Sequence, residues 1–407
     1  MTWQLSPLSL SGSLVQPFDG PVRTISMLEG NLDPLAYPLL FPYGDQGWNC
    51  GMLQNNPRTE TQKKISQNEY AAYRLSVRRV GDNLHKSGKL FLQWIVDMYV
   101  RIDAERLSYI RHHQKELRSD MYLNICDFVQ NQAEENNCDV GRMVVLPSSF
   151  SGSPRNMNER YQDAMSKVRE YGKPDIFVTF TCNLKWREIA EQLSPGESVH
   201  YRPDIVARVF HAKLKELIDD IAKKIGNVAA VIYTIEYQKR GLPHCHMLIS
   251  LVKENKIVGV NEIDKIVSAE LPDVDDPLYD IVRAHMIHGP CGTMSSAGRL
   301  SPCMDKKGLC KKQYPREWNE ETRQHENGYP VYRRRNDGRR VSKSGRELDN
   351  RWVVPYSRFL LLRYNAHINV EICTTVKSVN YIYINISTKD TMRARLVSRK
   401  TAFITTR

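Results

Sequence analysis

The spacing of apolar residues divides the chain into a helical part and a part that mixes strands with helices. Between residues 65 and 132, apolar side chains recur at intervals of three and four, as in "KLFLQWIVDMYVRIDAERLSYIRHHQKELR". That period predicts amphipathic helices. Residues 1–64 lack this period and are rich in proline, glycine, serine and asparagine, so we expect turns and short extended pieces there.

Apolar, β-branched runs predict a sheet in the middle of the chain. "VGRMVVL" and "DIFVTFT" predict strands, and helices are expected in "LKWREIAEQL" and over residues 205–224. "NVAAVIYTIEYQ" and "HCHMLISL" flank the glycine-containing loop "KRGLP", which predicts a β-hairpin. Strands mixed with helices predict an α+β fold with helices packed on a central sheet.

The composition changes between residues 284 and 346, where cysteine, glycine, proline and basic residues predict an inserted module. Beyond it, "RWVVPYSRFLLLRY" and "AHINVEICT" predict strands, and "TTVKSVNYIYINIS" predicts a helix. We therefore expect five segments: a loop-rich segment at 1–64, a helical part followed by the sheet core at 65–251, a connection at 252–283, the module at 284–346, and C-terminal elements at 347–407 that complete the core.

Two histidines stand one residue apart in the second strand of the hairpin. Alternate residues of a strand share a face, so His244 and His246 point one way and Cys245 and Met247 the other. Glu236, on the preceding strand, can add an oxygen ligand. Two nitrogens and a carboxylate suit Mg²⁺ or Mn²⁺ acting on a phosphate, and would also accept Zn²⁺. The alternative is that the imidazoles are held by hydrogen bonds within the fold.

Net charge narrows the class of partner. Among 407 residues, 58 Lys and Arg stand against 46 Asp and Glu, giving a net charge of +12. This balance favours a polyanion, either nucleic acid or an acidic membrane surface. The start of the chain lacks the pattern of a secretory signal, and no apolar run is long enough to cross a bilayer, so we expect a nuclear or cytoplasmic protein without a membrane partner.

The cysteines of the module have spacings that allow metal binding. In a reducing compartment, clustered cysteines favour metal over disulfides. "HGPCGTMSSAGRLSPCMDKKGLC" offers four zinc ligands, with His285 as a rival to the first: His288, Cys291, Cys303 and Cys310. The alternative is a cysteine-containing loop packed by proline and glycine.

A basic cluster follows in "VYRRRNDGRRVSKSGR" and is flanked by Tyr332 and Trp352. Its cations can neutralise DNA phosphates, and the two aromatic rings can stack on unpaired bases. A solvated basic loop is the alternative. The cations are Arg333, Arg334, Arg335, Arg339, Arg340, Lys343 and Arg346.

These blocks, taken in order, resemble a known family. "YQKRGLPHCHMLISL" resembles the HUH motif region of Helitron transposon proteins, the rolling-circle Rep part that precedes a helicase. "LPSSFSGSPRNMNERYQDAM", "DIFVTFTCNLKWREI", "HMIHGPCG", "SPCMDKKGLCKKQYP", "NGYPVYRRRNDGR" and "RWVVPYSRFLLLRYNAHINVEICTTVKSVNYIY" resemble successive family blocks, over roughly residues 65–394. The resemblance implies an antiparallel-rich sheet of HUH/Rep type, a single-stranded DNA partner and a nuclear location.

The resemblance also implies a chemistry. HUH nucleases cut single-stranded DNA by tyrosine attack on a phosphodiester, which leaves a 5′-phosphotyrosine and a free 3′-hydroxyl. The resemblance makes His244 and His246 the metal-binding pair, with Glu236 or Gln238 as the third ligand. Thr181 and Asn183, at the first Rep motif, would help to position the backbone, with a structural role at the end of the sheet as the alternative.

The resemblance assigns the nucleophile to Tyr381. Family members carry two tyrosines four residues apart on a helix, and the second position here is Asn385. Tyr383 would point about 200° around the helix and does not replace it. One tyrosine suffices for nicking, whereas holding donor and target strands together calls for two. The alternative is that Tyr381 is only an amphipathic helix residue.

The phosphate-binding loop of ATPases has no counterpart in the sequence, so we expect neither ATPase nor helicase activity from this chain. A helicase domain or partner would come from another chain. The leading hypothesis is a Helitron-derived single-strand endonuclease and strand transferase. The alternatives are a catalytically dead, transposon-derived DNA-binding remnant, and a zinc-dependent nucleic-acid module in which the sheet is only a scaffold.

Overall fold

The structure, a computed structural model, has the predicted α+β architecture. It describes residues 13–15, 20–54, 62–77, 84–114, 116, 144–238, 241–257, 259–291, 303–305, 307–324, 330–373 and 392–396, and for 13–15 and 392–396 the backbone alone. The chain forms two compact units: Met1–Pro147 with Leu193–Asp204, and Ser148–Gln192 with Ile205–Arg407. Among the described residues, no helix combines the length and apolar character needed to cross a membrane.

The first unit is built on one long helix. Its elements are β1 (Ser13–Val15), β2 (Arg23–Ile25), α1 (Leu32–Ala36), α2 (Gln67–Arg74), α3 (Lys89–His112), and 3-10 turns at Leu84–Lys86 and Val199–Tyr201. α3 buries Phe91, Trp94 and Met98 at helical spacing, against a cluster that includes Phe41 and Trp48. This arrangement confirms the helical pattern expected after residue 65, with α2 and α3 as separate helices.

A buried ion pair connects α1 to α3 in the first unit. The Arg101 guanidinium lies 2.6 Å from the Asp33 carboxylate, and both side chains are almost fully buried. Removing two charges from water costs free energy, and the attraction between them recovers only part of it. A single buried charge without its partner would therefore destabilise the fold far more than the pair does.

The second unit contains a five-stranded antiparallel sheet among the described residues, in the order β10-β3-β5-β4-β11. The strands are β3 (Ile176–Thr181), β4 (Val228–Tyr237), β5 (Pro243–Leu251), β10 (Ile368–Ile372) and β11 (Met392–Leu396). β4 and β5 form the predicted hairpin. Its turn is closed by the Gly241 N–H donating to the Gln238 carbonyl at 2.7 Å, with Gly241 at φ +77°.

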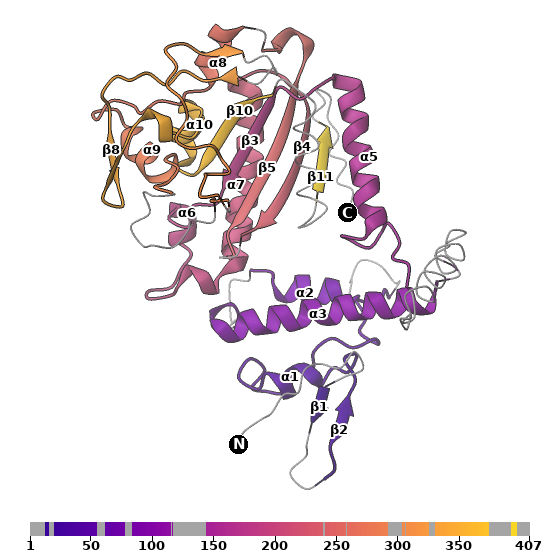
Figure 1. Cartoon of the computed structure of the whole chain (residues 1–407). Coiled ribbons are helices and arrows are strands. Elements are labelled where there is room, and N and C mark those ends of the chain that lie inside the picture. Colours follow the sequence, from indigo (N-terminus) through magenta and orange to yellow (C-terminus); the bar gives the residue numbers. More distant parts are fainter. Residues whose placement is uncertain are drawn as a thin grey trace. The chain divides into compact units, whose positions relative to one another are not determined.

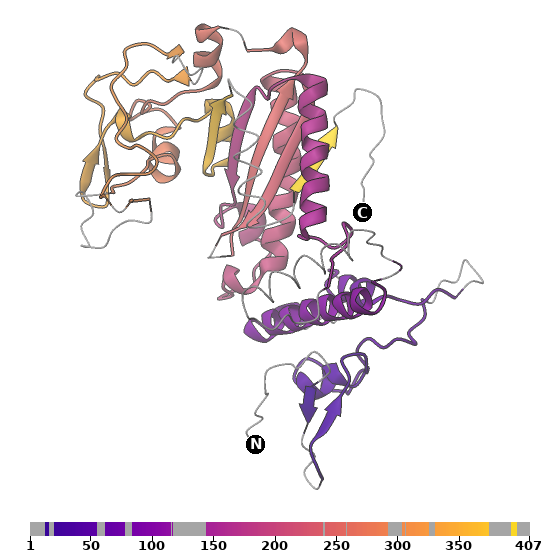
Figure 2. The same ribbon diagram turned by 45° about the vertical axis from the view of Figure 1, so that its right-hand side comes forward.

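Helices cover both faces of this sheet (Figures 1 and 2). α7 (Pro203–Lys224) lies on one face, where Phe210 stacks on Phe180 of β3 at 5.2 Å between ring centroids. α5 (Pro154–Tyr171) lies on the other, where Ala164 and Val168 pack against apolar side chains of β4 and β5. α5 begins where the Ser153 hydroxyl accepts the Asn156 N–H.

A loop-rich region attached to the sheet has a core of its own. Its elements are α8 (Val260–Ile266), α9 (Tyr279–His285), α10 (Arg358–Tyr364), β6 (Arg323–Gln324), β7 (Pro330–Val331), β8 (Val341–Lys343), β9 (Arg346–Leu348), and a 3-10 turn at Asn350–Trp352. Leu278, Val282, Met286, Trp352 and Tyr356 are among the buried side chains of that core. Outside this region, α6 (Arg187–Ala190) follows β3, and a 3-10 turn at Lys253–Asn255 follows β5.

Three sequence expectations were wrong in detail. "RWVVPYSRFLLLRY" forms a 3-10 turn and α10 instead of a strand, because Leu360, Leu361 and Tyr364 bury one helical face while Leu362 and Arg363 face water. Of the strand expected in "VGRMVVL", residues 140–143 lie outside the described residues and residues 144–146 form no strand, and the helix expected in "LKWREIAEQL" shortens to α6. The helix expected at 374–387, including Tyr381, Tyr383 and Asn385, lies outside the described residues.

The Asp33–Arg101 pair gives a stability prediction. Asp33→Ala or Arg101→Met alone should lower the free energy of unfolding by about 3–5 kcal/mol, because each leaves one buried charge unpaired. The double variant should recover most of that loss. Chemical denaturation followed by circular dichroism measures it, and strictly additive losses in the double variant would contradict a coupled pair.

Candidate functional site

A row of polar side chains crosses the sheet next to the β4–β5 turn. In the register of the sheet, His244 of β5 lies between Thr181 of β3 and Glu236 of β4. His367, just before β10, continues the row beyond Thr181, whose N–H donates to the His367 carbonyl at 3.0 Å. Cross-strand neighbours of this kind bring residues from four chain segments onto one face.

The histidine pair, His244 and His246, is placed by strand alternation as the sequence predicts. The two ring centroids are 4.5 Å apart, and the rings are nearly perpendicular at 83°. Cys245 and Met247 point to the opposite face and are fully buried there. Further from the turn, the histidine-bearing face becomes apolar and is covered by α5, so the pair lies where the covered part of the sheet ends.

Two threonines of β3 orient the imidazoles. The Thr181 hydroxyl lies 2.6 Å from Nδ1 of His244, and the Thr179 hydroxyl lies 3.1 Å from Nδ1 of His246. With Nδ1 of each ring engaged, Nε2 is the nitrogen that each imidazole would offer to a metal ion. A hydroxyl that fixes the other ring nitrogen is the outer-shell partner that a metal-ligating histidine requires.

Burial keeps these imidazoles neutral. Desolvation, followed by the charges of His246, His367 and Lys312, lowers the pKa of His244 to about 3. Desolvation and then Lys312 lower the pKa of His246 to about 4. A neutral imidazole keeps the lone pair that a metal ion needs, so both rings suit metal binding at neutral pH.

His367 is the residue of this site that sequence reasoning missed. Its Nδ1 lies 3.5 Å from the Thr181 hydroxyl, and burial first, then the charge of His285, lowers its pKa to about 4. His367 stands in "AHINVEICT", a predicted strand, but the sequence does not specify which strand this segment pairs with. The pairing of β10 with β3 brings His367 to the site.

Two other predicted supporting residues have distinct environments. The Asn183 amide donates to the Asn365 carbonyl at 2.6 Å, and its side-chain oxygen accepts the Lys185 N–H at 2.9 Å. These contacts match the structural role at the end of the sheet. The Gln238 amide nitrogen lies 3.5 Å from Nδ1 of His244, so Gln238 lies beside the histidine pair.

The four predicted zinc ligands come together in the loop-rich region. The candidate ligand atoms of His288, Cys291, Cys303 and Cys310, here called the Cys3His cluster, all lie within 4.8 Å of one another. The group can hold a metal ion such as zinc. His285, the rival ligand, is instead hydrogen-bonded to Asn365, and burial lowers its pKa.

Comparison with known families identifies part of the chain. Residues 70–249 match the family described as the Helitron helicase-like domain at N-terminus. Over this range the chain is similar to a Helitron helicase-like N-terminal domain. The matched range begins within α2, includes α3, β3, β4 and the histidine pair, and ends before the Cys3His cluster, the basic cluster and residue 381. No curated protein matches the chain.

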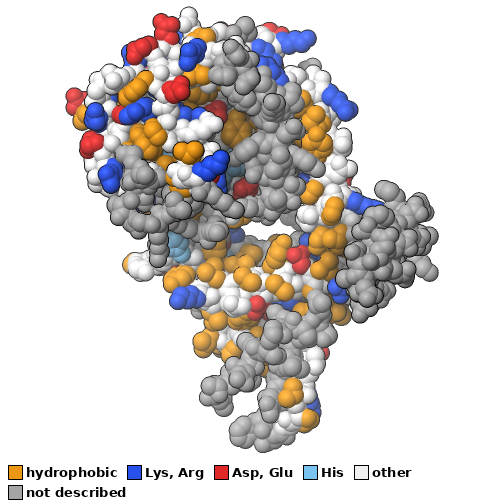
Figure 3. All heavy atoms as spheres, viewed as in Figure 1, with side chains coloured by type: hydrophobic (Ala, Val, Ile, Leu, Met, Phe, Trp, Pro, Cys, Tyr) orange, Lys and Arg blue, Asp and Glu red, His pale blue; other side chains and the backbone are white. Residues whose placement is uncertain are grey.

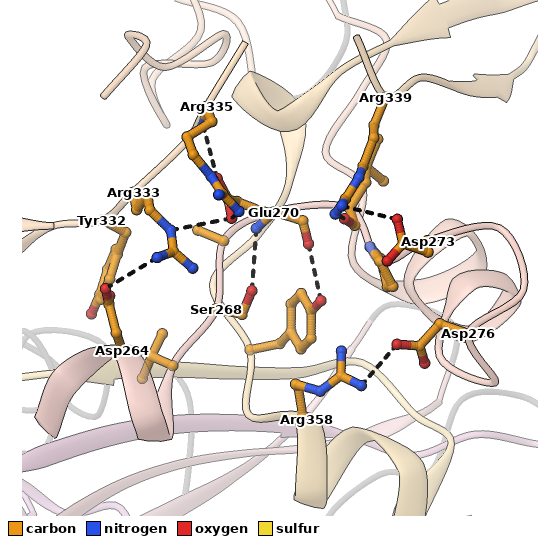
Figure 4. A pocket seen from close by; sticks show the side chains of 15 residues that line it. Asp264, Ser268, Glu270, Asp273, Asp276, Tyr332, Arg333, Arg335, Arg339 and Arg358 are labelled. Carbon is orange, nitrogen blue, oxygen red and sulfur yellow. Dashed lines mark hydrogen bonds and ion pairs between the residues drawn. The ribbon is translucent and has the colours of Figure 1, made fainter. Parts of the chain in front are cut away.

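Downstream of the matched range, three of the seven cations of the basic cluster pair with carboxylates. A pocket of about 220 Å³ is lined by four arginines and four acidic residues (Figure 4). Arg335 makes a two-nitrogen contact with the Glu270 carboxylate, which also accepts from Arg333 at 3.3 Å. Arg339 lies 2.9 Å from Asp273, and Arg358 pairs with Asp276. The pocket is therefore close to charge balance.

The rest of the basic cluster divides into buried and exposed side chains. Arg334 is buried, and its Nη1 lies within 3.2 Å of the carbonyls of Ala269, Asn350 and Val353. The Lys343 ammonium donates to the Ile287 carbonyl. Arg340 and Arg346 are exposed, and in the part of the chain that the structure describes neither side chain forms an ion pair within 4 Å.

The aromatic residues that flank the basic cluster are not available for base stacking. Tyr332 is buried, and its hydroxyl accepts the Ile372 N–H at 2.9 Å. Trp352 belongs to the core of the loop-rich region. On the face shown in Figure 3, basic and acidic side chains are interspersed over this region. Exposure, which a sequence does not report, decides which aromatic rings can meet a base.

The histidine pair predicts a pH dependence of stability. In metal-free protein, the folded-state pKa values of about 3 and 4 lie below the unfolded value of about 6.5. The unfolded chain then binds more protons below pH 6.5, so stability is full above that pH and falls towards pH 4, with a slope of up to about 1.4 kcal/mol per pH unit for each histidine.

Denaturation curves measured with chelator between pH 7.5 and pH 4 would test this slope. The variant His244→Gln/His246→Gln should lose stability less steeply than the wild type over the same range. An identical slope in both proteins would contradict buried, neutral imidazoles.

The buried and exposed cations of the basic cluster predict unequal effects on stability. Arg334→Met should lower the free energy of unfolding by about 3 kcal/mol or more, because three buried carbonyls lose their donor. The matched variant Arg346→Met removes an exposed charge and should stay within about 0.5 kcal/mol of the wild type. Urea denaturation measures both, and equal losses would contradict the assignment.

Proposed function

We propose that this protein is a metal-dependent single-stranded DNA endonuclease and strand transferase of a Helitron-type rolling-circle element. The observation that carries the proposal is the histidine pair: two neutral imidazoles on one strand face, oriented by threonines, with Glu236 paired across from His244. The Helitron helicase-like N-terminal domain, which contains the pair, supports the same assignment.

The donor set fits a catalytic divalent ion. His244, His246 and Glu236 would supply two nitrogens and one carboxylate oxygen, which leaves coordination positions open for a phosphate. Mg²⁺ or Mn²⁺ is the expected ion, and when bound it polarises the scissile phosphate as a Lewis acid. His367 is the neighbouring imidazole on the same row and would restrict how the substrate approaches.

The nucleophile in this proposal is Tyr381, which lies outside the described residues. Its hydroxyl loses a proton and attacks the phosphorus, forming a phosphotyrosine bond. The bond from phosphorus to the 3′-oxygen breaks, and that oxygen takes up a proton to become a free 3′-hydroxyl. The bond energy is kept in the tyrosyl ester, which allows the strand to be rejoined later.

The partners follow from this chemistry. The substrate is single-stranded DNA, in the nucleus, and strand separation would come from a helicase domain or protein on another chain. Asn385 occupies the position of a second tyrosine, so the proposal is limited to one covalent attachment at a time. If Tyr381 does not react, the protein is a transposon-derived DNA-binding remnant instead.

Covalent capture of DNA tests the proposal. Full-length protein incubated with single-stranded oligonucleotides and Mn²⁺ should form a denaturation-resistant adduct. Tyr381→Phe should abolish the adduct, and the matched variant Tyr383→Phe should keep it. His244→Ala should lower the rate of adduct formation by at least about 100-fold, because Lewis-acid stabilisation of the transition state is worth several kcal/mol.

Two outcomes of this experiment would contradict the assignment. An adduct that survives Tyr381→Phe would move the nucleophile elsewhere in the chain. DNA binding without any adduct, in Mn²⁺ and in Mg²⁺, would support the alternative that the protein is a DNA-binding remnant without nuclease activity. Binding measured separately in His244→Ala/His246→Ala distinguishes loss of chemistry from loss of affinity.

A further inference from the structure

We propose that His288, Cys291, Cys303 and Cys310 bind one structural Zn²⁺, and that this ion fixes the 310–314 loop. The zinc site stands independently of the nuclease.

The separations within the Cys3His cluster match those of a tetrahedral zinc site. Nε2 of His288 lies 3.3 Å from Sγ of Cys310 and 3.8 Å from Sγ of Cys291. Zinc bonds of ~2.3 Å to sulfur and ~2.0 Å to nitrogen, arranged as a tetrahedron, separate the ligand atoms by roughly 3.5–3.8 Å. All four ligand atoms already lie within 4.8 Å of one another, so an ion requires only small adjustments.

The chemistry of the cluster favours a closed zinc site over the other common divalent ions. Three thiol sulfurs and an imidazole are soft ligands that Mg²⁺ and Ca²⁺ avoid. Four protein ligands leave no position for a substrate, which is the arrangement of structural zinc. The histidine pair, with a carboxylate and no sulfur, has the opposite character.

The backbone around the cluster is shaped to present its ligands. The His288 N–H donates to the Trp352 carbonyl at 2.9 Å, and the Lys311 N–H donates to the Cys303 carbonyl at 2.8 Å. Gly289 has φ +96°, and a Cβ there would lie 2.8 Å from the Trp352 ring. A residue with a side chain would therefore displace the segment that carries the first two ligands.

Groups outside the four ligands support the cluster as they do in zinc sites. The N–H groups of Lys312 and Tyr314 donate to the Cys310 sulfur. The Tyr314 ring stacks on His288, with centroids 4.3 Å apart. Contacts of this kind orient metal ligands and stabilise a thiolate. They also tie the 310–314 loop directly to the cluster.

Metal analysis tests the zinc site without any nuclease assay. Full-length protein purified with zinc should retain one zinc per chain after dialysis, and Cys303→Ser should lose it. Cys50→Ser, an exposed cysteine outside the cluster, is the matched control and should keep the metal. After chelation and cobalt replacement, a sulfur-to-cobalt charge-transfer band should appear. Cobalt bound at the histidine pair would not give this band, because that site has no sulfur ligand.

Three results would overturn the zinc site. The first is that the purified protein contains no zinc. The second is that zinc is lost in His244→Ala/His246→Ala but kept in Cys303→Ser. The third is that mass spectrometry of the intact protein shows a disulfide between two cluster cysteines. Cobalt replacement is done on the wild-type chain, so the assignment is still tested if Cys303→Ser fails to fold.

Discussion

The pairing of β5 with a strand on each side is the constraint on which the rest of the site depends. It places His244 between Thr181 and Glu236, and His246 opposite Thr179. A slip of one residue would turn both histidines into the apolar face that packs against α7 and would expose Cys245 in their place. Burial of the apolar face thus fixes the strand register, and the register fixes which polar side chains are neighbours in the row. A change that weakens the core would therefore also disturb the geometry of the site.

The position of the polar row on the sheet sets its electrostatics. α5 covers the apolar part of the same face, and the histidine pair lies at the end of that cover, half-buried. Burial disfavours the charged imidazolium and would be costly for an unpartnered ring, but the hydroxyls of Thr179 and Thr181 supply a partner for each ring. Burial and hydrogen bonding together give neutral, oriented imidazoles, which neither would give alone.

Sequence alone predicted the features that depend on local pattern. Strand alternation placed His244 and His246 on one face, the glycine-containing loop gave the hairpin, and the cysteine spacing found the four ligands that the fold brings together. What it could not predict depends on contacts between distant segments. Thr181 and His367 are 186 positions apart and meet only because β10 pairs with β3. Burial of Arg334 likewise depends on carbonyls from two other segments.

The net charge of +12 therefore overstates the surface available to DNA. Affinity for a polyanion follows the number of phosphates neutralised, and a guanidinium already paired with a carboxylate or buried among carbonyls neutralises none. Glu270 engages two arginines of the basic cluster, and the core of the loop-rich region contains a third. The cations that remain exposed, such as Lys312 and Arg346, are held by that same fold. Their placement relative to the histidine pair, rather than the number of basic residues in the sequence, determines whether a strand can reach it.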